Sequence, residues 1–391
     1  MNAASSNKWY RRLKPPLAVI IAVCVLPAVL MIAFYALRPV SSVMAWAAVS
    51  VSAPVRGFLG LLSSIYPISM MEVLCTAAGI WLIYYLIRTI MVTAHRRSKL
   101  KILAKRLLPV VVAALYIWSL FCWLWNSGYH APGFASRSGF AGGGVSAEDL
   151  IAVTKSFAEK ANEFSLLVNR DTDGRYIADR RVMFAESTEI YDSISEEFPV
   201  LSGRLYRPNS MLYSWLMSRT GYSGMYFALT GEANINTMPP GALMPATVAH
   251  EHAHQLGVFA EDEANFVGIA ACVSSGNVVF EYAGYLSGLI YLLGALSSED
   301  LVAWYDICDT LSDEVLFDWN ENSGFWQSQR TVNTGIAFID SVLTTVTVTV
   351  SDAVDSIYDG YLKSQNQQLG IKSYGACVDL LVEYFSVEIA P

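Results

Sequence analysis

Three long apolar stretches in the first third of the chain limit its possible folds more than any other feature. They cover about residues 16–37, 71–92 and 107–125. Each approaches the roughly 20 residues that a helix needs to cross the hydrocarbon core of a bilayer. The third ends in aromatic residues typical of a membrane–water interface, namely Trp118, Phe121, Trp123 and Trp125. We therefore expect residues 1–127 to form a membrane domain with three transmembrane helices.

Charge divides the 391 residues into two unlike parts. Residues 1–127 carry 13 Lys and Arg but a single acid, Glu72, whereas residues 128–391 carry 13 Lys and Arg and 33 acids. Only 15% of all residues are charged, against about a quarter in a soluble domain, which disfavours a purely cytosolic protein. The acidic second part would repel phosphates. The expected partners are thus the lipid bilayer and no nucleic acid.

Basic residues in the short loops predict the orientation of the membrane domain. The N-terminal segment and the loop between the second and third stretches are rich in Lys and Arg, but the first loop carries only Arg38 and Arg56. By the positive-inside rule the N-terminus is cytoplasmic and the residues after 127 are extracytoplasmic, in a multi-pass protein of the cell membrane. The apolar segment 43–66 either lies flat on the outer surface or dips into the membrane, and a complete fourth span there would reverse this orientation. A cleaved signal peptide is the alternative for the first stretch, which is long for that role.

The sequence patterns predict that the second part of the chain forms one mostly helical domain. Residues 128–146 are rich in Gly and Ser and are expected to be a linker, followed by the domain over 147–391. Gly224–Asn236 predicts a strand or hairpin. Apolar spacing predicts helices over about 147–168, 183–196, 245–254, 260–273, 282–296 and 299–316, with a last helix starting near 332. The expected fold class is mainly α: three N-terminal transmembrane helices followed by an α-rich extracytoplasmic domain with a small β-sheet.

Two of these helical segments have an alternative. The segment 282–296 is too short and too Gly-rich for a further span, and we expect a buried core helix. Thr344–Thr349 has strand propensity, but the near-helical spacing of the residues that follow favours a helix.

One pentapeptide carries recognisable chemistry. Residues 250–254 read His-Glu-His-Ala-His, an H-E-x-x-H motif. On a helix that begins near Pro245 and ends at Gly257, His250 and His254 lie on one face and can reach one ion. Glu251, one position further round, can act as the general base for a zinc-bound water. His252 is expected to face away from the pair, at the surface or behind the metal ligands; the competing interpretation of the whole motif is an ordinary histidine pair.

A zinc site of this type needs a third protein ligand. Ala260 stands where one class of zinc peptidases has a further His, so that pattern fails. The next predicted helix opens with Glu261-Asp-Glu-Ala-Asn265, close to the E-x-x-A-D pattern of glutamate-liganded zincins. We expect Glu261 to bind the metal and Asn265 to hold a ligand histidine by its outer N–H. Glu263 is the alternative ligand, and a helix N-terminus by itself favours such acids.

Substrate-binding residues are predicted less sharply. Asn234 or Glu232 could face a cleft beside the motif, or could belong to a plain turn. Tyr374 or Tyr226 could donate a hydrogen bond to a developing oxyanion, or could be a core tyrosine. No Cys-x-x-Cys pair is present, so neither a disulfide framework nor a cysteine zinc site is indicated.

The sequence resembles the bacterial membrane-protein family catalogued as domain of unknown function 3810. The segments that carry the resemblance are Thr230–Asn236, His250–Phe266, Tyr282–Leu286 and Tyr361–Leu380. The resemblance covers nearly the whole chain and implies an integral membrane protein with a zinc-peptidase signature, but no substrate. His252 stands where a Leu is more usual in this family.

Together these patterns predict a membrane-anchored zinc metallopeptidase of the glutamate-zincin type that hydrolyses peptide bonds in a peptide or protein substrate. Zn²⁺ would be held by His250, His254 and Glu261, with Glu251 as general base. The alternative is a non-catalytic zincin-like scaffold or binding protein. Glu251 favours the enzyme, because a purely structural site has no need of a carboxylate beside an open coordination position.

Overall fold

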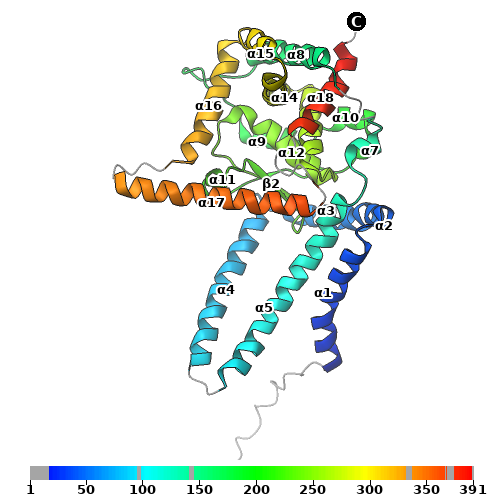
Figure 1. Cartoon of the computed structure of the whole chain (residues 1–391), viewed down its shortest axis with the longest axis vertical. Coiled ribbons are helices and arrows are strands. Elements are labelled where there is room, and N and C mark those ends of the chain that lie inside the picture. The colour runs from blue at the N-terminus through cyan, green and yellow to red at the C-terminus, as the bar shows by residue number, and fades with distance from the viewer. Residues whose placement is uncertain are drawn as a thin grey trace, which may run out of the picture.

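The described part of the chain has a stem of three long helices below a mainly helical domain (Figure 1). A computed structural model describes residues 17–94, 98–140, 145–331, 337–365, 367 and 374–389. The stem consists of α1 (Leu17–Leu37), α4 (Met70–Ala94) and α5 (Lys99–Phe121). These helices correspond to the three predicted spans, although α5 begins eight residues before the apolar stretch does.

Four helical segments in the described residues are long and apolar enough to cross a membrane: Ser41–Ser63, Met70–Ala94, Lys99–Tyr129 and Val278–Glu299. The described part of α1 contributes a shorter apolar helix, Ile21–Leu37. These apolar helices are compatible with a multi-pass membrane protein. Half of the apolar window of Val278–Glu299 is buried inside the domain, which confirms the predicted core helix.

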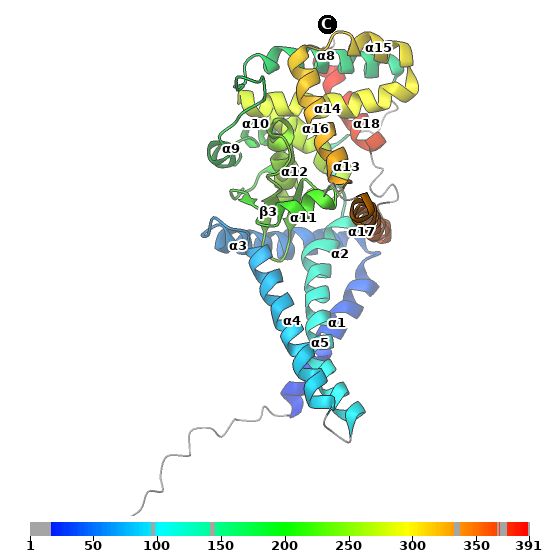
Figure 2. The same cartoon turned by 90° about the vertical axis from the view of Figure 1, so that its left-hand side faces the viewer.

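The segment whose placement the sequence left open runs across the end of the stem. It consists of α2 (Ser41–Trp46), a π-helical stretch (Ala47–Ser52) and α3 (Ala53–Ser63). In both views these elements lie roughly perpendicular to α4 and α5, between the stem and the domain (Figures 1 and 2). Ser63 donates a hydrogen bond to the carbonyl of Thr230 at 2.6 Å, so α3 packs directly against the domain.

The domain is built from short and medium helices around one small sheet. Its helices are α6 (Ser127–Tyr129), α7 (Phe134–Ser138), α8 (Ala147–Ser165), α9 (Arg180–Glu186), α10 (Asp192–Glu197), α11 (Ser214–Arg219), α12 (Met244–Leu256), α13 (Glu261–Val273), α14 (Val278–Glu299), α15 (Leu301–Cys308), α16 (Asp313–Gln329), α17 (Ala337–Ser364) and α18 (Tyr374–Ile389). Short 3₁₀ turns at Pro199–Leu201 and Gly241–Leu243 complete the list, and a π-helical turn (Cys122–Asn126) joins α5 to α6. The core forms where α14 packs against α8, α12, α13 and α18.

The sheet has three short strands in the order β1-β3-β2. The central strand β3 (Glu232–Ile235) pairs in parallel with β1 (Asn209–Ser210) and antiparallel with β2 (Gly224–Phe227). The last two strands form the hairpin predicted from Gly224–Asn236. Gly231 has φ +71° in the turn between them, a conformation that favours glycine.

Local sequence signals explain several helix ends. Ser146 caps α8 by accepting the N–H of Asp149. The predicted helix 299–316 is instead two helices, because Asp300 caps the start of α15 and Ser312 caps a new start at α16. The predicted helix 183–196 is likewise divided between α9 and α10.

The stretch that composition marks as a linker, 128–146, is largely ordered in its described part. It contains α7, and Phe134 is fully buried in the core of the domain. Residues 141–144 lie outside the described residues. Thr344–Thr349 is helical within α17, as predicted. The predicted start of the last helix near 332 falls on residues 332–336, which lie outside the described residues.

Two buried carboxylates join the stem to the domain. Glu232 on β3 accepts hydrogen bonds from the backbone N–H groups of Met70 and Met71 at 2.8 and 2.9 Å. In the opposite direction, Glu72 on α4 accepts from the backbone N–H groups that follow β1, at Leu212 and Tyr213, at 2.7 and 2.8 Å. Each carboxylate thus satisfies backbone donors on the other side of the junction.

We predict that Glu232→Ala lowers the stability of the whole protein. The change leaves the N-terminal donors of α4 and the Asn209 side chain without their acceptor, and losing several hydrogen bonds to a buried charge costs about 2–4 kcal/mol. The check is the apparent melting temperature of the full chain in detergent. Glu189→Ala, at an exposed position, is the control and is expected to have little effect; equal melting temperatures for the two variants would contradict the prediction.

Candidate metal centre

The site depends on how closely two consecutive helices approach one another. α12 ends at Leu256, and Gly257, which has φ +92°, caps it and turns the chain within four residues into α13. Further along, a Cβ atom on Gly268 would lie only 2.9 Å from the backbone nitrogen of His250. Glycine at this position therefore lets α13 pack directly on the helix that carries both histidines.

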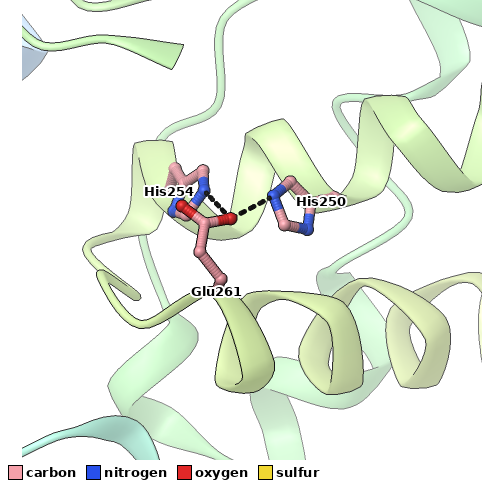
Figure 3. Close-up of side chains that lie close together, drawn as sticks. All are labelled: His250, His254 and Glu261. Carbon is pink, nitrogen blue, oxygen red and sulfur yellow. Dashed lines mark ion pairs between the residues drawn. The ribbon is translucent and has the colours of Figure 1, made fainter. Parts of the chain in front are cut away.

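This packing brings three predicted residues together. Oε2 of Glu261 lies 3.3 Å from Nε2 of His250 and 3.6 Å from Nε2 of His254 (Figure 3). The two imidazole rings have centroids 4.6 Å apart. One ligand atom from each residue lies within 4.8 Å of the others, so the group could hold a metal ion.

A hydrogen bond orients His254, but its partner is not Asn265, the residue that the sequence pattern predicted. Nδ1 of His254 donates to the carbonyl of Val258 at 2.7 Å, which leaves Nε2 facing the cluster. Asn265 is half-buried on α13, and no hydrogen bond joins it to either histidine within the described residues. The carbonyl in the tight α12–α13 turn takes the role expected of Asn265. The buried Nδ1 of His250 has no partner in the described structure.

The charges in the cluster stabilise one another. Burial opposes protonation of His254, but the nearby Glu261 and Glu251 outweigh burial and raise the pKa of His254 to about 9. Burial alone would raise the pKa of Glu261, yet the two imidazoles hold it well below its ordinary value. The site therefore favours the ionised form of Glu261 and a positive charge between Glu261 and the two histidines.

Glu251 lies in the wall of the site, against the edge strand. Its side chain is buried, and a Cβ atom on Gly224 of β2 would lie 2.5 Å from Oε1, so glycine leaves the space that the carboxylate fills. Oε2 has no hydrogen-bond partner among the described residues. Desolvation raises the pKa of Glu251, although the two histidines and the backbone of Tyr226 act in the opposite direction.

Glu263, the alternative ligand, is engaged elsewhere. Its carboxylate accepts hydrogen bonds from the backbone N–H groups of Phe134 and Ala135 at 2.7 and 3.0 Å, at the start of α7. A Cβ atom on Gly133 would lie 2.4 Å from Oε1 of Glu263, so glycine leaves room for this contact. Glu263 thus ties α13 to α7, and only Glu261 faces the histidines.

One residue at the cluster had no sequence signal. The hydroxyl of Tyr358, on α17, donates to Oε1 of Glu261 at 2.6 Å. The two residues are 97 positions apart, and no local pattern distinguishes Tyr358 from other tyrosines of a helix. Tyr374, one predicted oxyanion donor, begins α18, but its side chain lies outside the described residues.

The other sequence candidates lie in the sheet. Asn234 is fully buried, and its Nδ2 group is 3.4 Å from the carbonyl of Met225 on the neighbouring strand. Glu232 binds the start of α4, as described above. The hydroxyl of Tyr226 accepts a hydrogen bond from Arg56 at 3.3 Å.

Residues at the end of the stem form the floor of the site. The Trp125 ring, in the π-helical turn after α5, meets the His254 ring edge-on at 5.5 Å between centroids. It also packs on Phe259 at 4.8 Å. Beneath them the buried Arg56 of α3 donates to the carbonyl of His254 at 3.1 Å. The cluster therefore sits directly on the end of the stem.

These features define a mainly helical protein with several apolar helices and a possible His-His-Glu metal site. The model of the family described as "Protein of unknown function (DUF3810)" matches residues 50–382. The chain belongs to this family. No curated protein and no solved structure matches it.

His252 belongs to the core rather than to the surface. It is fully buried on the opposite side of α12, with Nε2 3.0 Å from Oγ of Ser187. Burial lowers the pKa of His252 to about 3, so the folded protein keeps this imidazole neutral. The unfolded chain takes up a proton near pH 6.5. The contribution of neutral His252 to the free energy of unfolding is therefore fully present above that pH, and it is lost as the pH drops from about 6.5 towards 3.

We predict that His252→Leu reduces the sensitivity of the fold to acid. The wild type loses up to about 1.4 kcal/mol per pH unit below pH 6.5 through this one group, and the variant does not. The check is the apparent melting temperature of both proteins between pH 7.5 and 5. Ser187→Ala is the matched control, because it removes the hydrogen bond but keeps the titrating imidazole. Parallel curves for the wild type and His252→Leu would refute the prediction.

Proposed function

We propose that the protein is a membrane-anchored zinc metallopeptidase of the glutamate-zincin type that hydrolyses peptide bonds. The observation that carries the proposal is the convergence of His250, His254 and Glu261 beside a buried carboxylate, Glu251, one oxygen of which has no partner among the described residues. Two imidazoles and one carboxylate form a donor set of catalytic zinc sites, which keep a position open for water or substrate.

The donor set fits a zinc ion in chemistry and in arrangement. Both Nε2 atoms and Oε2 of Glu261 point into the same space (Figure 3). The raised pKa of His254 indicates that this space already favours a positive charge. When bound, zinc would supply Lewis acidity towards a water molecule and a peptide carbonyl.

The remaining chemistry belongs to the side chains around the cluster. Glu251 would take a proton from the attacking water and return it to the leaving amine, and its raised pKa suits a group that must both accept and release a proton. Tyr358 would fix the orientation of Glu261 through its hydrogen bond. Strand β2 is an edge strand of the sheet and packs on α12, so it would align an extended peptide by backbone hydrogen bonds.

The positive-inside pattern supports an extracytoplasmic active site. In the described residues the far end of the stem carries Lys99, Lys101, Lys105 and Arg106, whereas the end beneath the domain carries Arg38 and Arg56. The far end would be cytoplasmic and the domain would lie outside.

A non-catalytic scaffold is the second candidate function. Glu261 contacts both histidines and also accepts the hydroxyl of Tyr358, so the carboxylate is satisfied by protein groups alone. A zincin-like binding protein without hydrolytic activity would retain this pairing.

We predict that the purified full chain contains about one zinc per molecule and cleaves polypeptides. His254→Ala is expected to lose the metal, because it removes one of three ligands. Glu251→Gln is expected to keep the zinc and to lose at least about 100-fold in kcat, because it removes the general base. The checks are metal analysis by mass spectrometry and hydrolysis of a fluorogenic peptide library.

His130→Ala is the control for zinc content, since His130 is not part of the cluster. A folded wild type that binds no zinc even after zinc addition would exclude the peptidase. Zinc binding with no cleavage by the wild type would favour the scaffold.

We predict that Tyr358→Phe weakens zinc binding by about 10-fold or more, the usual effect of losing a hydrogen bond that orients a metal ligand. The measurement is zinc affinity by competition with a chelator. Tyr361→Phe is the matched control, because the Tyr361 hydroxyl binds Asn126 instead of the cluster. Equal affinities of the two variants would show that the contact between Tyr358 and Glu261 does not support the metal.

A further inference from the structure

The helix that carries Tyr358 lies at an unusual place in the molecule. α17 is 28 residues long and runs across the axis of the stem, close to the level at which the stem helices end and α2 and α3 cross (Figures 1 and 2). Its N-terminal half extends past α4 in Figure 1. It is not among the helices that are apolar enough to span a membrane.

α17 has an apolar stripe that no described part of the protein covers. The exposed residues of the stripe are Ile339 (39%), Val342 (46%), Leu343 (40%), Val346 (52%), Val350 (47%) and Ile357 (73%). Their spacing of three, four and seven residues places them along one face of the helix. The stripe contains no charged residue, although four Asp and one Lys occur elsewhere on the same helix.

A different face of α17 contacts the domain. Tyr358 binds Glu261, Leu362 is buried beside Trp125 and Phe259, and Ser351 is buried near α11 and α16. A third, polar face carries exposed groups such as Asp352, and Lys363 pairs with Asp359 at 2.6 Å. The helix therefore has one side for the protein, one for water and one apolar side without a described partner.

Neighbouring elements at the same level also expose apolar side chains. Trp215 and Leu216 on α11 are 57% and 48% exposed, and Leu212 just before this helix is 63% exposed. On α3, Phe58 is 59% exposed. The exposed apolar surface of the stem thus continues outward onto the underside of the domain. Because the stripe is continuous with the exposed apolar surface of the stem, the same lipid that would surround the stem would also cover the stripe.

We propose that α17 is an interfacial helix that lies on the bilayer, with its apolar stripe in the boundary between lipid headgroups and acyl chains. The stripe presents Ile, Val and Leu side chains along one side of the helix, and the acidic residues of α17 stay on its other faces. Tyr358 then reaches the cluster from a helix held at the lipid surface. The inference goes beyond the proposed peptidase activity, because it concerns the partner of α17 and holds with or without hydrolysis.

The test measures the depth of two neighbouring positions in lipid vesicles. The full chain, with Cys24, Cys75 and Cys308 replaced by Ser, receives either Val346→Cys on the stripe or Thr345→Cys on the polar face, and each is labelled with bimane. After reconstitution into phosphatidylcholine vesicles, we expect lipids with a nitroxide near the headgroup to quench the label at position 346 at least threefold more than at 345. Iodide in the water should show the reverse order.

Two outcomes would overturn the proposal. Equal quenching by iodide at both positions would place the stripe in water. Protection of position 346 from both iodide and lipid nitroxide would mean that protein, such as a second copy of the chain, covers it. The measurement uses neither zinc nor a substrate, so its failure is distinguishable from failure of the proposed activity. The positive control for lipid contact is Ile80→Cys, labelled in the same way, because Ile80 is exposed on α4.

Discussion

The close contact of α12 with α13 is the constraint on which the site depends. Gly257 turns the chain within four residues, and Gly268 lets the second helix approach the backbone at His250. One carboxylate is thereby held against two imidazoles in a largely buried cluster, where unlike charges interact more strongly than in water. The residues around the cluster then serve this arrangement: Trp125 supports His254 from below, and Tyr358 holds Glu261 from α17.

Sequence reasoning succeeded where a feature is local. The histidine pair follows from helical spacing, the ends of α12 from Pro245 and Gly257, and the stem helices from long apolar runs. The sequence could not separate Glu261 from Glu263, because the difference lies in what each carboxylate meets. Glu263 meets backbone donors about 130 residues earlier in the chain, and only the folded structure brings those donors to it.

Three further features were missed. Composition marked 128–146 as a linker, but Gly133 leaves the space that the Glu263 carboxylate fills, and Phe134 is buried in the core. Asn265 matches the sequence pattern of glutamate-liganded zincins, yet His254 donates its hydrogen bond to the carbonyl of Val258 instead. Tyr358 reaches the cluster because α17 packs beside it. Helical spacing in the sequence predicts that α17 is a helix but not where this helix packs. The errors on 128–146 and Tyr358 come from contacts between elements distant in the chain, whereas the error on Asn265 comes from a backbone acceptor only four residues after His254.

The helix from Lys99 to Tyr129 is continuous, passing from α5 through a π-helical turn into α6. Its lower part has the length and apolar character of a span, and its upper end carries the ring that touches His254. A bilayer that is thicker or thinner than a spanning helix changes the tilt of that helix. Since a continuous helix moves largely as one body, a change of tilt would displace Trp125 beneath the histidine. For a stem that crosses a bilayer, the thickness of that bilayer would thus be a physical variable of the site itself.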